Sequence, residues 1–562
     1  MAKASTRNPI SSHPYPDIVS HPASDIRQST RRDVLIAVGL AFAVIVTRFP
    51  VRSRRVFNWD AVNFVLAVGH YDVRLHHPHP PGYPVFVAMG RLLMFVIPDA
   101  NGALVAVAML LSAGAVAALF WLGKTLYDRP TGLVAALYLL FSVTFWTNGA
   151  VALAYASLAL FGTLVALFAW RLWGQYRGVA PIDSASMNAV PGARYSLLLS
   201  LAYALGGGFR PDLLLFLAPL WIWGHWRAGR RRTIIGALVA AAVIAGWAVP
   251  MIALSGGVDA YLKVLRAYTT TDVLQRYSVA ENGPRALLVN IRDTATYTGY
   301  ALYALTLPVL CALLWLLFRV IRRQTTDATV RISSPGSALF FALWIVPMLL
   351  FYTWVHIGDP GYVFTFVPAL LLLAARSTTS IVASVYRATH NITSGSNAIA
   401  NGHARPQWWS PFVVLVAVVL VALPIAANTA IFLKRPLTLT APGIRQQDRT
   451  IDGKLAYVRA HGDPATTMLV SYESYRHWLL YLPEYRTQFV DVTYGTEADR
   501  TLSMPPDITQ VILMDDTLIR AAGAITPTDT ATIEHDRVET VHATSAPLHF
   551  APVSSPLNAP HA

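Results

Sequence analysis

The segment 58–84, NWDAVNFVLAVGHYDVRLHHPHPPGYP, combines one carboxylate with a cluster of imidazoles next to an apolar span. Asp60 supplies the acid, and His76, His77 and His79 supply the imidazoles. A positioned aspartate can accept a proton from an attacking hydroxyl, and histidine can donate hydrogen bonds to a phosphate. The segment therefore indicates a catalytic site at the membrane rim, and Asp60 is its main catalytic candidate.

Two other interpretations of the acids remain open. Asp60 is also suited to cap a helix from Ala61 to Gly69, since aspartate is a preferred N-cap residue. Asp72 is a second acid, but a helix between the two would separate them by ~18 Å at 1.5 Å per residue. We therefore do not expect both carboxylates to act on one atom.

The histidine run is interrupted by proline and lacks the fixed spacing of a zinc site, so no metal ligand is predicted. We instead expect His77 and His79 to donate hydrogen bonds to a phosphate. The surrounding turn is stiff because proline restricts the backbone, which would also suit a purely structural return of the chain to the membrane. Its residues are Pro78, Pro80, Pro81, Gly82 and Pro84.

The elements that must position these residues are transmembrane helices. Of the 562 residues, 54% are apolar and 13% are charged, which excludes a soluble multidomain protein. Only helices satisfy their own backbone in lipid at such lengths, so the predicted class is an α-helical polytopic bundle. We expect about eleven spans: Val34–Thr47, Ala103–Gly123, Thr131–Trp146, Val151–Trp170, Tyr195–Leu205, Leu213–Trp226, Thr233–Leu254, Gly299–Phe318, Ser337–His356, Tyr362–Ala375 and Pro411–Leu433.

Arginine placement orients the chain, because loops rich in Lys and Arg remain in the cytoplasm. Arg31 and Arg32 place the N-terminus inside, and eleven crossings place the C-terminus outside. This odd number of crossings requires a hairpin over Tyr195–Trp226, broken at Gly206–Gly208, and a segment Val85–Ile97 that lies in the membrane interface and does not cross. The predicted units are a cytoplasmic tail (1–32), a membrane domain (33–433) whose first external loop is 51–102, and a small external domain (434–562).

The external domain has an α/β pattern of short elements. Strands are predicted at Thr467–Ser471, Gln488–Val492 and Val511–Asp515, with a helix over Tyr472–Leu482. The last forty residues either form a hairpin from Val538–Val541 and Leu548–Phe550 or remain irregular.

The net charge of +14 is largely arginine at the predicted cytoplasmic face, where anionic lipid headgroups lie. It gives no indication of a nucleic-acid partner. The single cysteine, Cys311, lies within an apolar span, so no intrachain disulfide can form.

An acid soon after the first span, the motif HPPGYP and a polytopic body with an outer C-terminal domain resemble the GT-C glycosyltransferases. The most similar branch contains protein O-mannosyltransferases, lipid A aminoarabinose transferases and related uncharacterised bacterial proteins. The resemblance covers about Arg31 to Leu433, is clearest over 58–84, and extends to Gly207–Trp221 and His356–Leu372. The chain departs from that pattern where Ala61 replaces a second acid, and where no Glu precedes Tyr155.

The resemblance implies inverting transfer of a sugar from a polyprenyl-phosphate donor to a glycan, lipid or protein acceptor at the outer face of the bacterial inner membrane. Asp60 would be the base, and Arg210, His77 and His79 would stabilise the departing phosphate, since Arg matches phosphate oxygens. Tyr83 completes the expected substrate-binding set. No cofactor is required, although a divalent cation can bridge Asp60 and the donor phosphate.

Several alternatives stay open at this stage. Arg210 can simply pair with Asp212, two residues on, because an unpaired charge in an apolar hairpin is costly. The external loop Ser255–Thr298 can cover the donor or the acceptor, or be an ordinary solvated loop. Other functions compatible with the chain are a lipid-linked saccharide flippase and a non-catalytic envelope assembly protein, of which the flippase would require polar residues across the bundle.

Overall fold

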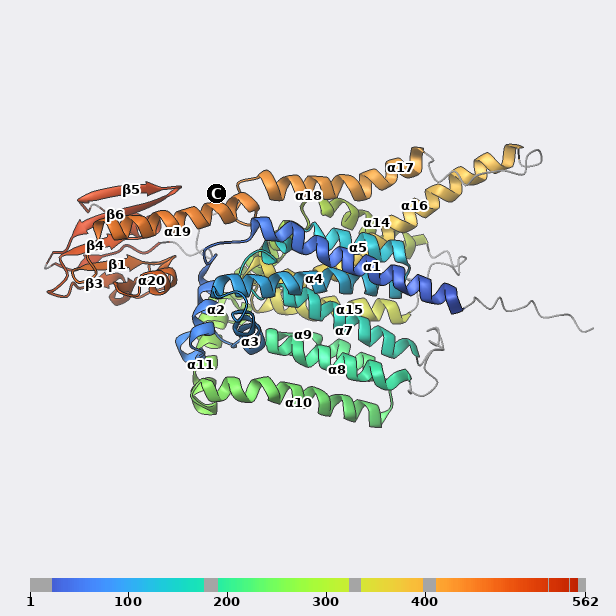
Figure 1. The fold of residues 1–562 in the computed structure, drawn as a ribbon, viewed down its shortest axis with the longest axis horizontal. Coiled ribbons are helices and arrows are strands. Elements are labelled where there is room, and N and C mark those ends of the chain that lie inside the picture. Colours follow the sequence, from blue (N-terminus) through green and yellow to red (C-terminus); the bar gives the residue numbers. More distant parts are fainter. Residues whose placement is uncertain are drawn as a thin grey trace, which may run out of the picture.

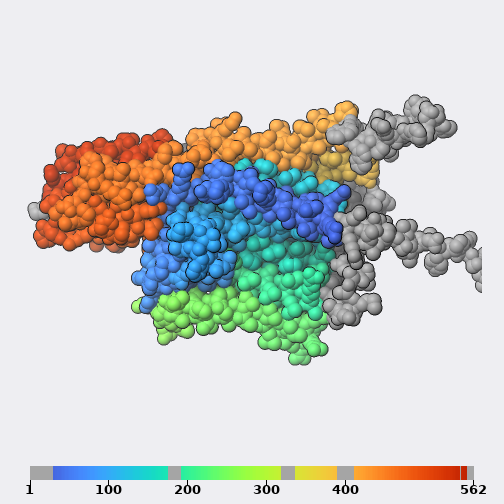
Figure 2. Space-filling model, in the orientation of Figure 1, coloured from blue at the N-terminus to red at the C-terminus, as the bar shows by residue number. Residues whose placement is uncertain are grey.

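The computed structural model describes residues 23–175, 191–322, 335–397 and 411–553, apart from 524 and 545. Long helices lie side by side in one body, and a small domain with a sheet projects from one end of it (Figure 1). The space-filling view shows this C-terminal domain, in orange and red, beyond the same end at which the segment 51–102 lies (Figure 2). The predicted helical class with a small C-terminal α/β unit is therefore confirmed.

Eight helical segments within the described ranges are long and apolar enough to cross a membrane. They are formed by α1 (Ala23–Arg48), α4 (Ala100–Leu126), α7 (Ala156–Gln175), α10 (Arg230–Leu254), α13 (Val279–Leu302) with α14 (Thr306–Arg322), α15 (Pro335–Trp354), α16 (Val367–Asn397), and α17 (Pro411–Ala417) with α18 (Leu423–Lys434). Further helices in the bundle are α5 (Arg129–Leu140), α6 (Val143–Asn148), α8 (Pro191–Phe209) and α9 (Asp212–His225). Residues 1–22 of the predicted tail 1–32 lie outside the described residues. Residues 23–32 form the beginning of α1, which starts at Ala23.

The break in the predicted hairpin falls at Arg210–Pro211, after the three glycines rather than at them. Pro211 cannot donate a backbone hydrogen bond, so α8 ends before it. The three glycines lie within α8, where neighbouring side chains approach them so closely that a larger residue would not fit. A Cβ on Gly206 would lie 2.9 Å from the Cβ of Phe161, and one on Gly208 would overlap Val85.

Three other predicted spans also have different limits. The stretch predicted as Thr131–Trp146 divides into α5 and α6 around Ser142. The helical region expected from Gly299 begins at Val279, and Tyr303 interrupts it with a positive φ of 43°. The region from Tyr362 starts as a 3-10 helix, η6 (Pro360–Thr365), before α16 begins at Val367.

The segment 51–102, predicted to be the first external loop, forms two short helices, α2 (Trp59–Gly69) and α3 (Pro84–Leu93), joined by a turn. Asn58 caps α2, since its Oδ1 accepts a hydrogen bond from the N–H of Ala61 at 3.0 Å. Arg91 on α3 donates to the carbonyls of Ala67 and Val68, at 2.9 Å each, in the last turn of α2. A cation at this helix end is favourable, so Arg91 fixes α2 and α3 together.

The C-terminal domain contains a long helix and a five-stranded sheet, ordered β2-β1-β4-β6-β5. The elements are α19 (Ala441–His461), β1 (Thr467–Ser471), α20 (Tyr475–Tyr481), β2 (Arg486–Phe489), β3 (Thr501–Leu502), β4 (Gln510–Leu513), α21 (Asp516–Ala522), β5 (Asp529–Ile533), β6 (Asp536–His542) and β7 (Leu548–His549). β1 runs parallel to β2 and β4, whereas β6 is antiparallel to β4 and β5.

The three predicted strands and the helix exist, with limits shifted by a few residues. The predicted hairpin is wrong, because β6 pairs with β5 through a two-residue turn that includes Glu534 at φ 57°. The segment at Leu548 pairs instead with β3.

The segment 53–57 joins the membrane body to the C-terminal domain. The carboxylate of Asp448 on α19 accepts hydrogen bonds from the backbone N–H groups of Arg54 and Arg55 at 2.8–3.1 Å. Val56 donates its N–H to the Tyr481 hydroxyl at 2.9 Å, and its carbonyl lies 3.1 Å from Nε2 of His477. The segment that leads into α2 is thus hydrogen-bonded to both α19 and α20.

Candidate active site

A cavity of about 680 Å³ lies between one end of the helical body and the C-terminal domain. Its lining comes from α2 and the following turn, from the connection after α11 (Val258–Ala267), from the segment before η6 and from the C-terminal domain. The residues are Asn58, Trp59, Asp60, Asn63, His76, His79, Tyr155, Tyr268, Asp272, Arg276, Tyr277, His356, Gly358, Asp359, Tyr362, Tyr472, Glu473, Arg476, Phe489, Asp491 and Tyr494. Four residues of the stretch Ser255–Thr298 line the cavity, namely Tyr268, Asp272, Arg276 and Tyr277.

Asp60 lies in the first turn of α2 with 34% of its side chain exposed. Asn58, and not Asp60, caps the helix. The carboxylate of Asp60 is therefore not needed for the cap, and it lines the cavity. One carboxylate oxygen accepts a hydrogen bond from the Tyr155 hydroxyl at 3.5 Å, and the other lies 3.7 Å from Nδ1 of His79. The position and the exposure suit a general base.

His79 connects Asp60 to Tyr83. Its Nε2 lies 3.0 Å from the Tyr83 hydroxyl, while 8% of its side chain is exposed. Burial lowers the pKa of His79, although the nearby Asp60 carboxylate opposes this shift. The ring is therefore neutral at pH 7, with one nitrogen that donates and one that accepts.

Arg210 lies directly behind the cavity wall and is 3% exposed. Its guanidinium carbon lies 4.4, 4.9 and 5.4 Å from the ring centroids of Tyr362, Tyr155 and Tyr83. It also forms an ion pair with Asp212 at 3.1 Å. The structural pair expected as an alternative therefore exists, and the same cation supports two tyrosines that line the cavity.

His77 is the predicted substrate-binding residue that the structure separates from the others. Its backbone pairs with Asp72, and the carboxylate of Asp72 is bonded to Arg74 at 2.6 Å. His76 lines the cavity instead, with its pKa lowered to about 4 by burial. Within the set predicted from sequence, the structure brings together Asp60, His79, Tyr83 and Arg210.

Two arginines that were not candidates for phosphate binding line the cavity. Arg276 lies 3.3 Å from Asp272, and the guanidinium of Arg476 donates to the Leu75 carbonyl at 3.2 Å. The loop composition had placed Arg276 near the outer face. Arg476 comes from α20 in the C-terminal domain, and no local pattern could have connected it to a residue 401 positions earlier.

A second acid, Asp359, lies in the segment His356–Leu372, one of the stretches from which the family resemblance was predicted. Burial raises its pKa to about 6, against the hydrogen bond that its Oδ1 accepts from the Gly361 N–H at 2.9 Å. It lines the same cavity as Asp60. Over the described ranges, no group of three or more His, Cys, Asp or Glu side chains is placed to hold a metal ion.

Residues 68–233 match the family described as the protein O-mannosyl-transferase TMEM260 N-terminal domain. The match includes His77, His79, Tyr83 and Arg210, and it begins eight residues after Asp60. No curated protein matches the chain.

Among solved structures, the apo oligosaccharyltransferase of Archaeoglobus fulgidus is similar with a TM-score of 0.52 at 12% identity, over 85% of this chain and 69% of that one. The complex of that organism's AglB with an inhibitory peptide and a dolichol-phosphate gives 0.51 at 12% identity, over 87% and 70%. The chain shares their fold. ArnT from Cupriavidus metallidurans bound to undecaprenyl phosphate gives 0.49 at 13% identity, over 92% and 99%. The resemblance to GT-C glycosyltransferases is thus supported by the family match and by the fold.

Proposed function

We propose that this protein is a membrane glycosyltransferase that moves a sugar from a polyprenyl-phosphate donor to a cell-envelope glycan, lipid or protein acceptor. The observation that carries the proposal is the placement of the Asp60 carboxylate. It is exposed to a large cavity, free of the helix cap, and accompanied there by two arginines. The family match and the shared fold support the same class of reaction.

In the proposed reaction the acceptor hydroxyl attacks the anomeric carbon of the donor sugar. The Asp60 carboxylate takes the hydroxyl proton, a new carbon–oxygen bond forms, and the bond between that carbon and the phosphate oxygen breaks. The polyprenyl phosphate leaves with the electron pair, and the anomeric configuration inverts. Phosphate is a good leaving group, so a second carboxylic acid is not needed to protonate it, in contrast to glycoside hydrolysis.

Arg276 and Arg476 are the cations in the proposed site that can meet the donor phosphate, because both line the cavity with Asp60. Arg210 does not line the cavity; its guanidinium packs against the aromatic rings of Tyr155 and Tyr362 and holds them in place. Tyr155 and His79 orient the carboxylate. The proposal requires no cofactor. Addition of a chelator tests whether transfer depends on a divalent cation that would bridge Asp60 and the phosphate.

We propose that the cavity lies at the outer face of the bacterial inner membrane, with the N-terminus inside and about eleven crossings. The shorter helices α5, α8 and α9 would supply the crossings beyond the eight long apolar segments. A cavity at this level would receive a donor whose isoprenoid tail remains in the lipid.

The test is transfer of labelled sugar by the purified protein, with the native membrane fraction of polyprenyl-phosphate sugars as donor. Asp60→Asn is expected to abolish transfer without changing folding or membrane insertion. Asp99→Asn is the matched control, because Asp99 is an exposed cap of α4 whose hydrogen bond to Gly102 an asparagine preserves. Wild-type transfer by Asp60→Asn would overturn the proposed role, and saccharide transport into liposomes without any product would favour a flippase.

A further inference from the structure

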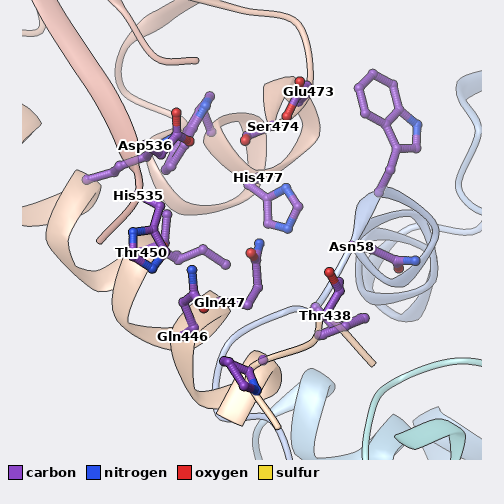
Figure 3. Close-up of a pocket in the computed structure, with 17 residues that line it drawn as sticks. Asn58, Thr438, Gln446, Gln447, Thr450, Glu473, Ser474, His477, His535 and Asp536 are labelled. Atoms are coloured by element: carbon purple, nitrogen blue, oxygen red, sulfur yellow. The ribbon is translucent and has the colours of Figure 1, made fainter. Parts of the chain in front are cut away.

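A second cavity, of about 690 Å³, lies on the other side of Trp59 from the active-site cavity. Its walls come from the connection after α18, from the first half of α19, from the start of α20 and from the turn between β5 and β6. Its lining residues are Phe57, Asn58, Trp59, Pro436, Thr438, Gly443, Gln446, Gln447, Thr450, Ile451, Lys454, Glu473, Ser474, His477, Trp478, His535 and Asp536. Figure 3 shows Gln447 reaching from α19 toward His477 on α20.

The lining is rich in groups that both donate and accept hydrogen bonds. Three side-chain amides (Asn58, Gln446 and Gln447) and three hydroxyls (Thr438, Thr450 and Ser474) surround the space (Figure 3). Gln446 and Gln447 each offer two donor hydrogens and an acceptor oxygen, and the hydroxyls of Thr438 and Thr450 can act in either role. Asn58 keeps its two donor hydrogens, since its oxygen caps α2, and Ser474 keeps its acceptor capacity, since its hydroxyl donates to Asp515 at 3.0 Å. Such a set matches a ligand that carries many hydroxyl groups.

The one Lys or Arg side chain that lines this cavity is already paired. Lys454 is 1% exposed, pairs with Asp536 and also donates to the Met514 carbonyl at 2.6 Å. Glu473 accepts a hydrogen bond from Thr517 at 2.6 Å, and burial lowers the pKa of His477 to about 4. A phosphate would need a cation with free hydrogen-bonding capacity, so the lining favours a neutral ligand over an anionic one.

The two cavities meet at the first turn of α2. Asn58, Trp59 and Glu473 line both of them, and Trp59 is the residue that precedes Asp60. The Trp59 ring is held by Phe489 at 5.8 Å and by Tyr475 at 6.2 Å between ring centroids. An indole offers an apolar face against which the carbon-bound hydrogens of a sugar ring can pack. A molecule bound in the second cavity can therefore extend past Trp59 to the Asp60 carboxylate.

We propose that this second cavity binds the neutral saccharide part of the acceptor, and that Gln447 and Thr450 hydrogen-bond its hydroxyls. The proposal rests on the proposed function and names its acceptor class as a glycan. It places donor and acceptor on opposite sides of Trp59. The reacting hydroxyl enters the active-site cavity while the rest of the saccharide stays between α19 and α20.

The experiment measures KM separately for the donor and for the acceptor, using purified full-length protein and protease-treated envelope polysaccharide as the acceptor probe. Gln447→Ala is expected to raise the KM for polysaccharide about threefold to tenfold, the loss of one hydrogen bond. Thr438→Trp is expected to abolish polysaccharide transfer, because a large side chain at this exposed position would fill the cavity without disturbing a core. The KM for the donor should stay within about twofold in Gln447→Ala.

Gln510→Ala is the matched control, since Gln510 lies at the start of β4 and donates to the His461 carbonyl outside both cavities. An unchanged KM for polysaccharide in both cavity variants would overturn the inference. So would normal polysaccharide transfer combined with impaired transfer to glycan-free envelope protein, which would identify a peptide site. Failure of the proposed function has a different signature, namely no transfer of sugar to any acceptor by the wild-type protein.

Discussion

The Nδ1 atom of His79 lies 3.7 Å from a carboxylate oxygen of Asp60, and the other ring nitrogen lies 3.0 Å from the Tyr83 hydroxyl. A buried tyrosine therefore sets the ring position of a neutral histidine, which in turn borders the proposed base. The three residues come from both ends of the 58–84 segment. The turn between α2 and α3 exists in this form because it brings residue 79 back to residue 60.

His79→Phe is expected to lower kcat/KM for transfer about 10-fold to 100-fold. The phenyl ring fills the same space, but Asp60 loses the ring nitrogen that lies 3.7 Å from its carboxylate, and a tenfold change in rate corresponds to about 1.4 kcal/mol. Initial rates with the polyprenyl-phosphate donor measure the change. His70→Phe is the control, because His70 is an exposed residue that follows α2. An unaltered kcat/KM in His79→Phe would show that the imidazole does not orient the base.

The sequence predicted the position of Asp60 well, but it left the cap of α2 undecided. Asn58 and Asp60 are both good capping residues, and only the backbone conformation decides between them. Asn58 has the extended φ of −145° that the cap position requires, which frees Asp60. Similarly, Arg210 could be placed in an apolar hairpin from sequence, but its three aromatic neighbours come from separate elements.

In the C-terminal domain, the sequence contains a signal for α19 that the predicted elements left out, and it contains none for the position of Arg476. Ile444, Ile451, Leu455 and Val458 are buried at spacings of seven, four and three, a helical pattern that indicates α19, yet the helix predicted for this domain was only that over Tyr472–Leu482. Arg476 had no comparable signal. Its entry into the active-site cavity depends on the tertiary contacts of the 53–57 segment with α19 and α20.

Asp359→Asn is expected to stabilise the protein at pH 7.5. Burial raises the pKa of Asp359 to about 6, against about 3.9 for an unfolded aspartate, so the folded state binds this proton more tightly. The wild type therefore loses stability as the pH rises from about 4 to 6, and the loss persists above that range. Asparagine avoids the buried charge and retains an oxygen for the Gly361 N–H.

Thermal unfolding measured from pH 4 to 8 tests this difference. The Tm of Asp359→Asn should exceed that of the wild type at pH 7.5, and the two values should converge near pH 4. Asp99→Asn, at an exposed cap, should give no pH-dependent difference of this kind. A wild type more stable than Asp359→Asn at pH 7.5 would show that the charged carboxylate is compensated in the folded protein.

Arg210→Met is expected to reduce the amount of folded protein strongly, because it leaves Asp212 beside buried aromatic rings without its cation. Removal of one partner of a buried pair typically costs about 3–5 kcal/mol. Asp212→Asn in the same chain should restore folding, since the double variant contains no unpaired charge. Size-exclusion profiles in detergent and thermal unfolding measure the recovery.

The double variant also separates the two interpretations of Arg210. If the guanidinium supports catalysis through Tyr155 and Tyr362, the refolded double variant should remain at least about 10-fold slower in transfer, a change of about 1.4 kcal/mol. Asp212→Asn alone provides the matched reference. Full activity in a well-folded double variant would reduce Arg210 to a structural partner of Asp212.

Asp448→Ala is expected to loosen the C-terminal domain from the membrane body. The carboxylate is 9% exposed and accepts the N–H groups of Arg54 and Arg55, so its removal leaves these donors without a partner and costs about 1–3 kcal/mol. Since the same segment leads into Asn58 and Asp60, transfer should fall together with the Tm. Asp452→Ala is the control, because its ion pair with Arg55 is exposed and such pairs contribute little. Limited proteolysis should cleave Asp448→Ala between α18 and α19 faster than Asp452→Ala; equal cleavage rates, with transfer intact, would mean that α19 and α20 are held to the membrane body by their other contacts alone.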